Sequence, residues 1–106
     1  MQTKSASAVV IIPGQPFIKW VNWANSISGF GPELSAEYFT DDCTILLIPQ
    51  FLTENEARKY IRTIWHEIFE RQLERYVEKP LWQQERTLEM FIKWFGFKFH
   101  SMALIT

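Results

Sequence analysis

The sequence contains few of the residues that build disulfide, metal or membrane-spanning structures. It has one cysteine, Cys43, so a disulfide within the chain is excluded. No run approaches the ~18 consecutive apolar residues of a membrane span. The apolar run near the N-terminus is shorter than the roughly 7–15 residues of a signal peptide core. With a net charge of −1, the chain lacks the excess of lysine and arginine that favours nucleic-acid binding. We therefore expect a cytoplasmic protein with no cofactor and no membrane contact, for which a nucleic-acid partner is disfavoured.

Aromatic residues, in contrast, are abundant. The chain has five tryptophans and nine phenylalanines among 106 residues, and 47% of its residues are hydrophobic. Each of these rings brings roughly 150–250 Å² of surface to bury. We predict a single domain over residues 1–106, with a frayed tail at residues 1–6. We also expect that a domain this small leaves some apolar surface for a partner.

Two similar segments suggest a fold with two related halves. Residues 8–12 and 44–48 are aliphatic runs that end at Pro13 and Pro49, and each precedes a helical pattern. Continuous aliphatic runs of this length are typical of strands that are buried on both faces. We expect 8–12 and 43–48 to be adjacent central strands.

The remaining segments complete the predicted order of elements. They are a helix from Pro16 to about Gly29 (with a strand over 17–24 as the alternative), a strand over 34–39, a helix over 53–78, a helix over 81–95 (with a strand over 87–95 as the alternative), and a strand over 97–105. This order describes a ferredoxin-like α+β two-layer sandwich, βαββαβ, with an extra helix before the last strand. The runner-up is an antiparallel sheet that includes 17–24, with helices on one face.

The helix over 53–78 is the clearest element. Thr53 and Glu56 form a capping box, in which each side chain accepts a hydrogen bond from a free backbone N–H. The helix would be roughly 39 Å long, whereas a six-residue strand spans only ~20 Å. Its second half, with Leu73, Tyr76 and Val77, therefore needs a further surface to cover it.

Two tryptophans fit their helical patterns least well. Trp23 and Trp82 lie off the apolar stripes of their segments, and tryptophan is enriched at the centres of protein interfaces. We predict that both anchor an interface together with Leu73, Tyr76 and Val77. The function expected first is a small non-enzymatic binding or regulatory module that acts as a homodimer or through a protein partner.

A metal or acid–base site is the second hypothesis, and it involves His66, Glu67 and Glu70. His66 and Glu70 are four residues apart and share one helical face, so both could reach one cation. Zn²⁺ requires three or four protein ligands, and only His100 is available as another histidine. A solvated helix face explains the same residues, so we expect neither a metal nor an enzyme.

RNA binding is the third hypothesis. Residues 93–99 are similar to part of an RNA-recognition signature, in which aromatic side chains on a strand stack on bases. Here Phe97 and Phe99 would provide the rings. Aromatic residues on a strand more often belong to the core, so RNA is expected less than a protein partner.

Overall fold

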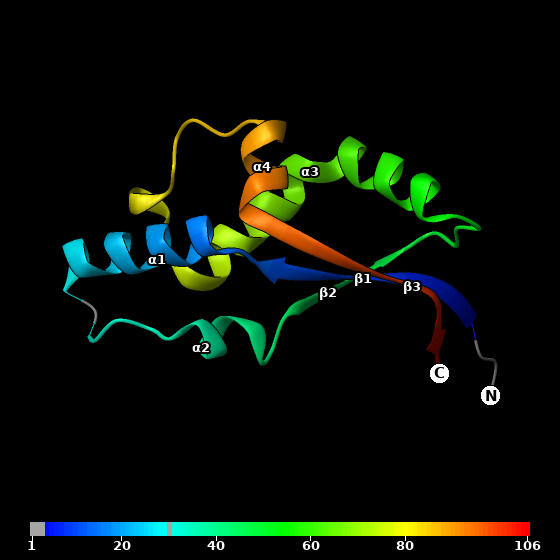
Figure 1. Cartoon of the computed structure of the whole chain (residues 1–106), viewed down its shortest axis with the longest axis horizontal. Helices are drawn as coiled ribbons and strands as arrows, with labels where there is room; N and C mark the ends of the chain where they lie inside the picture. The colour runs from blue at the N-terminus through cyan, green and yellow to red at the C-terminus, as the bar shows by residue number, and fades with distance from the viewer. Residues whose placement is uncertain (1–3, 30) are drawn as a thin grey trace.

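The central element of the fold is a ten-residue strand, β1, which pairs with another strand on each side (Figure 1). The computed structural model describes residues 4–29 and 31–106. Its elements are β1 (Lys4–Pro13), α1 (Gln15–Ser28), α2 (Ala36–Thr40), β2 (Thr44–Ile48), α3 (Glu54–Tyr76), the short 3-10 helix η1 (Lys79–Leu81), α4 (Leu88–Trp94) and β3 (Phe95–Ile105). None of the described helices has the length and apolar character that crossing a membrane requires.

The sheet has the order β2-β1-β3, and both pairings are antiparallel. Val9 lies opposite Leu46 on one side and Phe99 on the other. The prediction that 8–12 and 43–48 are adjacent strands is confirmed. Only β1 is central, however, and it begins at Lys4, inside the segment that we expected to be frayed. Residues 1–3 of that segment lie outside the described residues.

The expectation that 43–48 is buried on both faces is wrong. β2 is an edge strand, and the side chains of Ile45 and Leu47 are largely exposed. A continuous aliphatic run cannot reveal which of its faces a sheet leaves open, because its side chains alternate between the two faces irrespective of burial.

The predicted strand over 34–39 is also wrong, since this segment contains the helix α2. Ser35 precedes the helix and its hydroxyl accepts a hydrogen bond from the Tyr38 N–H, at 3.4 Å. This N-cap fixes a helical turn, which brings Phe39 into the core. The chain is thus an α+β domain with a three-stranded antiparallel sheet and four α-helices in its described residues. The fourth strand of a ferredoxin-like sheet is not found among those residues.

The helical interpretation of the segment after Pro16 is confirmed by α1. Phe17, Val21 and Ala24 are buried, and their spacing places them on one face. Pro16 lies in the first turn, where its missing N–H is tolerated. Gly29 caps the other end with φ of 75°, a conformation that favours glycine.

The predicted long helix is confirmed as α3, together with its capping box. The Thr53 hydroxyl accepts a hydrogen bond from the Glu56 N–H at 3.3 Å, and the Glu56 carboxylate accepts one from the Leu52 N–H at 3.1 Å. The second half of α3 extends past the sheet and is covered by the chain itself. The Phe39 ring of α2 lies 5.0 Å from the Tyr76 ring.

The single helix predicted over 81–95 is replaced by three pieces. η1 comes first, residues 82–87 are irregular, and α4 begins only at Leu88. The Thr87 hydroxyl accepts a hydrogen bond from the Met90 N–H at 3.1 Å, which caps α4 at that point. The alternative strand over 87–95 is also wrong.

The core lies between one face of the sheet and the helices α1, α3 and α4. Its centre is a group of phenylalanine rings, with Phe95 4.7 Å from Phe17, 5.5 Å from Phe69 and 5.6 Å from Phe91 between ring centroids. Figure 1 shows α3 and α4 on one side of the strands. The abundant aromatic residues of the sequence lie mainly in this core.

Candidate functional site: the uncovered face of the sheet

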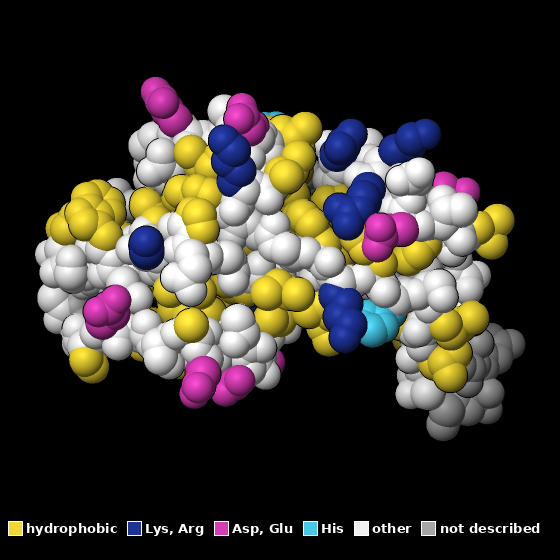
Figure 2. Space-filling model, viewed as in Figure 1, with side chains coloured by type: hydrophobic (Ala, Val, Ile, Leu, Met, Phe, Trp, Pro, Cys, Tyr) yellow, Lys and Arg dark blue, Asp and Glu magenta, His cyan; other side chains and the backbone are white. Residues whose placement is uncertain are grey.

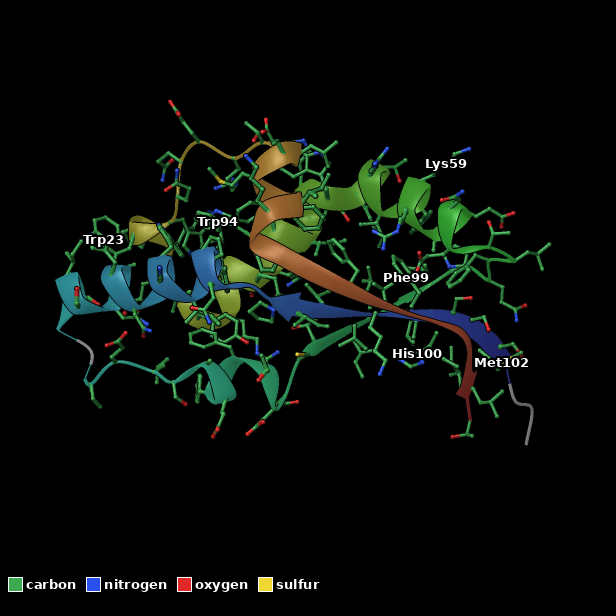
Figure 3. The ribbon with its side chains drawn as sticks, in the orientation of Figure 1. Trp23, Lys59, Trp94, Phe99, His100 and Met102 are labelled. Atoms are coloured by element: carbon green, nitrogen blue, oxygen red, sulfur yellow. The ribbon has the colours of Figure 1, made fainter. Side chains whose placement is uncertain are left out.

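The sheet has a second face, opposite the core. Ser7, Val9 and Ile11 of β1 are buried beneath the helices, so the residues between them point the other way. Figure 3 shows this alternation on β3, where the side chains of Phe99 and His100 lie on opposite sides of the strand. We define the uncovered face as Ala8, Val10 and Ile12 of β1, Ile45 and Leu47 of β2, and Lys98 and His100 of β3.

Six of these residues form two rows across the three strands. In one row Val10 lies between Ile45 and Lys98, and in the next row Ala8 lies between Leu47 and His100. Each row runs from an aliphatic side chain on β2 to a basic or imidazole side chain on β3. Ile45 is 62% exposed and Leu47 is 53% exposed, so the apolar end of the face is open to solvent.

Charged side chains lie at two ends of this side of the molecule. Glu37 and Asp41, in and after α2, are exposed, and so are Lys98 and His100 of β3. Figure 2 shows acidic side chains over α2 and, further along, a histidine beside a Lys or Arg side chain over the strands. The apolar residues of β1 and β2 therefore lie beside charges of both signs.

The whole chain exposes more surface than its mass predicts. Its accessible surface is 7176 Å², whereas a folded monomer of this mass exposes about 6200 Å². The radius of gyration is 15.2 Å, against about 13 Å for a compact domain of this length. The molecule measures 47 × 30 × 21 Å, and a thin shape of this kind follows from a single sheet with helices on one face only.

The two tryptophans predicted as interface anchors have different environments. Trp23 lies on α1 and is 59% exposed. Trp82 is half-buried, and its indole N–H donates a hydrogen bond to the Val77 carbonyl at 2.8 Å. Trp82 therefore holds the segment after α3 in place, whereas Trp23 contacts solvent.

The other predicted interface residues lie in or against the chain's own core. Leu73 and Val77 are buried, and Tyr76 packs beside them. The Tyr76 ring packs against Phe17 of α1 and Phe39 of α2. Burial raises the pKa of the Tyr76 hydroxyl above its ordinary value, and none of the described residues forms a hydrogen bond with this hydroxyl.

The candidate metal residues do not converge on one point. His66 is exposed and its ring lies 3.6 Å from the Trp65 ring. Glu70 forms an ion pair with Arg86 at 3.2 Å, and Glu67 is exposed and borders a different cavity, beside Ile64 and Ile68. His100 lies across the sheet from α3. Within residues 4–29 and 31–106, no group of three or more histidine, cysteine, aspartate or glutamate side chains is placed to hold a metal ion.

The aromatic residues proposed for RNA stacking face the helices. Phe97 lies 5.3 Å from Phe91, and Phe99 lies 6.1 Å from Phe51. Both rings are therefore part of the packing beneath α3 and α4. The exposed side of the same strand carries Lys98 and His100 instead.

Cys43 lies just before β2, beside the end of α2. Burial raises the pKa of its thiol; Arg75 opposes this rise, and Asp42 and Asp41 add to it. Burial, and not the neighbouring carboxylates, is the main cause of the rise in this pKa. A thiol with a raised pKa is a weak nucleophile at neutral pH.

The uncovered face was not predicted from the sequence, although one strand carries a pattern that indicates it. Phe97 and Phe99 alternate with Lys98 and His100, which is the pattern of a strand with one buried and one solvated side. Applied to the neighbouring strands, this alternation would have indicated that Ile45 and Leu47 face solvent.

Comparisons of the chain with protein-family models, with curated proteins and with solved structures find no match.

Proposed function

We propose that this protein is a small non-enzymatic module that self-associates, with two copies packing their uncovered faces together. The observation that carries the proposal is the exposure of Ile45 and Leu47 beside Val10 on one face of the sheet; Ala8, between Leu47 and His100 on this face, is only 6% exposed. Sheets commonly pack face to face at about 10 Å. Such packing would place the apolar side chains of two copies in contact.

The surface area supports a second copy as the occupant. The chain exposes about 1000 Å² more than a compact monomer of its mass. A standard interface buries roughly 800 Å² on each partner. Covering the uncovered face and its rim would remove an excess of this size.

The charges also favour a two-fold arrangement. In a symmetric dimer each patch meets the same patch of the other copy. An antiparallel arrangement would bring Lys98 and His100 of one copy toward Glu37 and Asp41 of the other. Opposite charges at the rim would then fix the relative orientation of the two sheets.

Replacing Leu47 with lysine tests the proposal. We expect the wild-type protein to sediment as a dimer, and Leu47→Lys to sediment as a monomer with an unchanged circular dichroism spectrum. Leu47 is already about half buried in the monomer, so each copy loses roughly half of the 1.5–3 kcal/mol that full burial of a leucine contributes, and the dimer should weaken at least ~10-fold. The measurement is sedimentation velocity over a range of concentrations.

Ile27→Lys is the matched control. Ile27 is 57% exposed at the end of α1, away from the uncovered face, so this variant should remain a dimer. A wild-type protein that is monomeric at every concentration would overturn the proposal. A dimer that Leu47→Lys leaves intact would do the same.

A further inference from the structure

The outer edge of β3 has unpaired backbone groups. Gly14 lies opposite Trp94, and its N–H donates a hydrogen bond to the Trp94 carbonyl at 2.8 Å. In an antiparallel pair, hydrogen-bonded and non-hydrogen-bonded positions alternate. Gly96 and Lys98 therefore bond to β1, while the N–H and C=O groups of Phe97 and Phe99 point away from it. No strand of the described chain lies on that side of β3.

A cavity opens beside this edge. It has a volume of about 250 Å³ and lies between the first half of α3, α4 and β3. Apolar side chains line it: Ile61, Leu88, Phe91, Ile92, Phe97 and Phe99. The space matches one apolar side chain of the size of leucine or phenylalanine, so it can select a residue of that kind.

Two arginines border the same cavity. The guanidinium of Arg58 lies over the Phe99 ring, 4.9 Å from its centroid, and Arg62 is one turn further along α3. Arg58 has an exposed ion pair with Glu54 at 3.4 Å, and Arg62 forms none with any described residue. Figure 2 shows several Lys and Arg side chains gathered over this half of α3, next to hydrophobic surface. The rim of the cavity is thus basic.

We infer that this groove binds an extended peptide, which adds to the free edge of β3 as a fourth strand. The backbone of the peptide pairs with Phe97 and Phe99, which is the mode of recognition known as strand addition. One apolar side chain enters the cavity. A carboxylate two residues along the peptide, on the same face and about 7 Å away, meets Arg58 and Arg62.

The two arginines are the reason for assigning an acidic peptide. Arginine binds carboxylates through paired hydrogen bonds, and these bonds are stronger than neutral ones. A lysine at the same place in the peptide would meet two like charges and be rejected. The groove shares no residue with the uncovered face, so this inference stands apart from the proposed self-association.

The test uses the full chain, labelled with ¹⁵N, and a set of blocked hexapeptides. Each peptide carries an apolar residue at its second position, glutamate, glutamine or lysine at its fourth, and threonine elsewhere. We expect the best glutamate peptide to shift the amide signals of Phe97 and Phe99, and to bind at least ~5-fold more tightly than its glutamine counterpart. Binding should weaken as salt is added.

Charge-reversal variants test whether the arginines at the cavity, and not other arginines of α3, determine the affinity for the peptide. Arg62→Glu should lower the affinity for the glutamate peptide by about tenfold and reverse the preference toward the lysine peptide. Arg71→Glu is the matched control, because Arg71 is exposed on the second half of α3, far along the helix. It should leave the affinity unchanged.

Two kinds of result would overturn the inference. One is a failure of recognition: no peptide of the set shifts the signals of Phe97 and Phe99, or lysine peptides bind as well as glutamate peptides. The other is binding without strand pairing: hexanoate, or a peptide methylated on its backbone nitrogens, binds as tightly as the unmodified peptide. The cavity would then be a site for a small anion, without strand addition.

Discussion

Two buried polar side chains, Ser7 and Gln72, differ in their hydrogen bonds. The Ser7 hydroxyl donates a hydrogen bond to the Ser101 carbonyl at 2.8 Å and accepts one from the Phe51 N–H at 3.1 Å. It thus ties β1 to an irregularity in β3 and to the loop before α3. Gln72 is only 1% exposed, yet within residues 4–29 and 31–106 neither its amide nitrogen nor its amide oxygen has a hydrogen-bond partner. A buried polar group without a partner destabilises the folded state.

Gln72→Met should therefore stabilise the protein. Methionine has a similar shape and no hydrogen bonds to lose, so we expect the free energy of unfolding to rise by about 1–3 kcal/mol. Urea denaturation followed by circular dichroism measures this change. Gln50→Met, at an exposed position, is the control and should change little. A loss of stability in Gln72→Met would instead indicate ordered water bound to the amide, in the adjacent cavity of about 170 Å³.

At the scale of elements, short helices depend on their caps. α4 has seven residues and connects the irregular segment 82–87 to β3. Helices this short have little stability of their own, so the Thr87 cap and the packing of Phe91 hold it. Because Leu88 and Ile92 of α4 line the groove, the order of this helix sets the shape of the peptide site.

Thr87→Ala should weaken both the fold and the groove. Loss of the cap costs about 1 kcal/mol of stability, and the amide signals of α4 should show faster hydrogen exchange. Thr63→Ala is the matched control, since Thr63 lies within α3, where its hydroxyl donates to the Tyr60 carbonyl. Alanine is a better helix former there, so that variant should be neutral or slightly more stable. Equal effects of the two changes would contradict the role of the cap.

The whole molecule is a single sheet with helices on one side, and this construction explains its shape. A two-layer domain with one open face is thin, exposes excess surface, and keeps apolar side chains at that face. Trp23, Ile27 and Leu52 are exposed elsewhere; Trp23 and Ile27 lie one turn apart on α1, outside the sheet.

Self-association should make thermal stability depend on protein concentration. A dimer that forms only between folded chains stabilises them by mass action, so the Tm of the wild-type protein should rise as its concentration increases. The Tm of Leu47→Lys should not depend on concentration, and the two proteins should converge at high dilution. Differential scanning calorimetry across a hundredfold range measures both. A constant Tm for the wild-type protein would contradict the prediction.

The elements with strong local signals could be predicted from the sequence. α3 has a capping box and a long apolar stripe, and β1 is a β-branched run that ends at a proline. α2 could not be predicted in the same way, because the alternation around Phe39 fits a short strand as well as a short helix. Whether this segment forms a helix depends on the Ser35 cap and on the contact of Phe39 with Tyr76, which lies far along the chain.

The candidate site was harder to predict than the fold. Aliphatic residues such as Ile45 and Leu47 have the same sequence signal whether a sheet is covered on one face or on two. The groove beside β3 combines Arg58 of α3 with Ile92 of α4 and Phe97 of β3. No local pattern indicates that these three segments meet, since the irregular segment 82–87 determines where α4 lies.

β3 links the two surfaces through its alternating geometry. Its odd-numbered residues 97 and 99 face the helices and leave their backbone groups free at the edge, while residues 98 and 100 belong to the uncovered face. A strand added at this edge would widen that face by about 4.8 Å. A bound peptide and a second copy of the chain would then share one enlarged sheet. If the added strand changes the affinity for the second copy, thermodynamic reciprocity requires that the second copy changes the affinity for the peptide by the same factor.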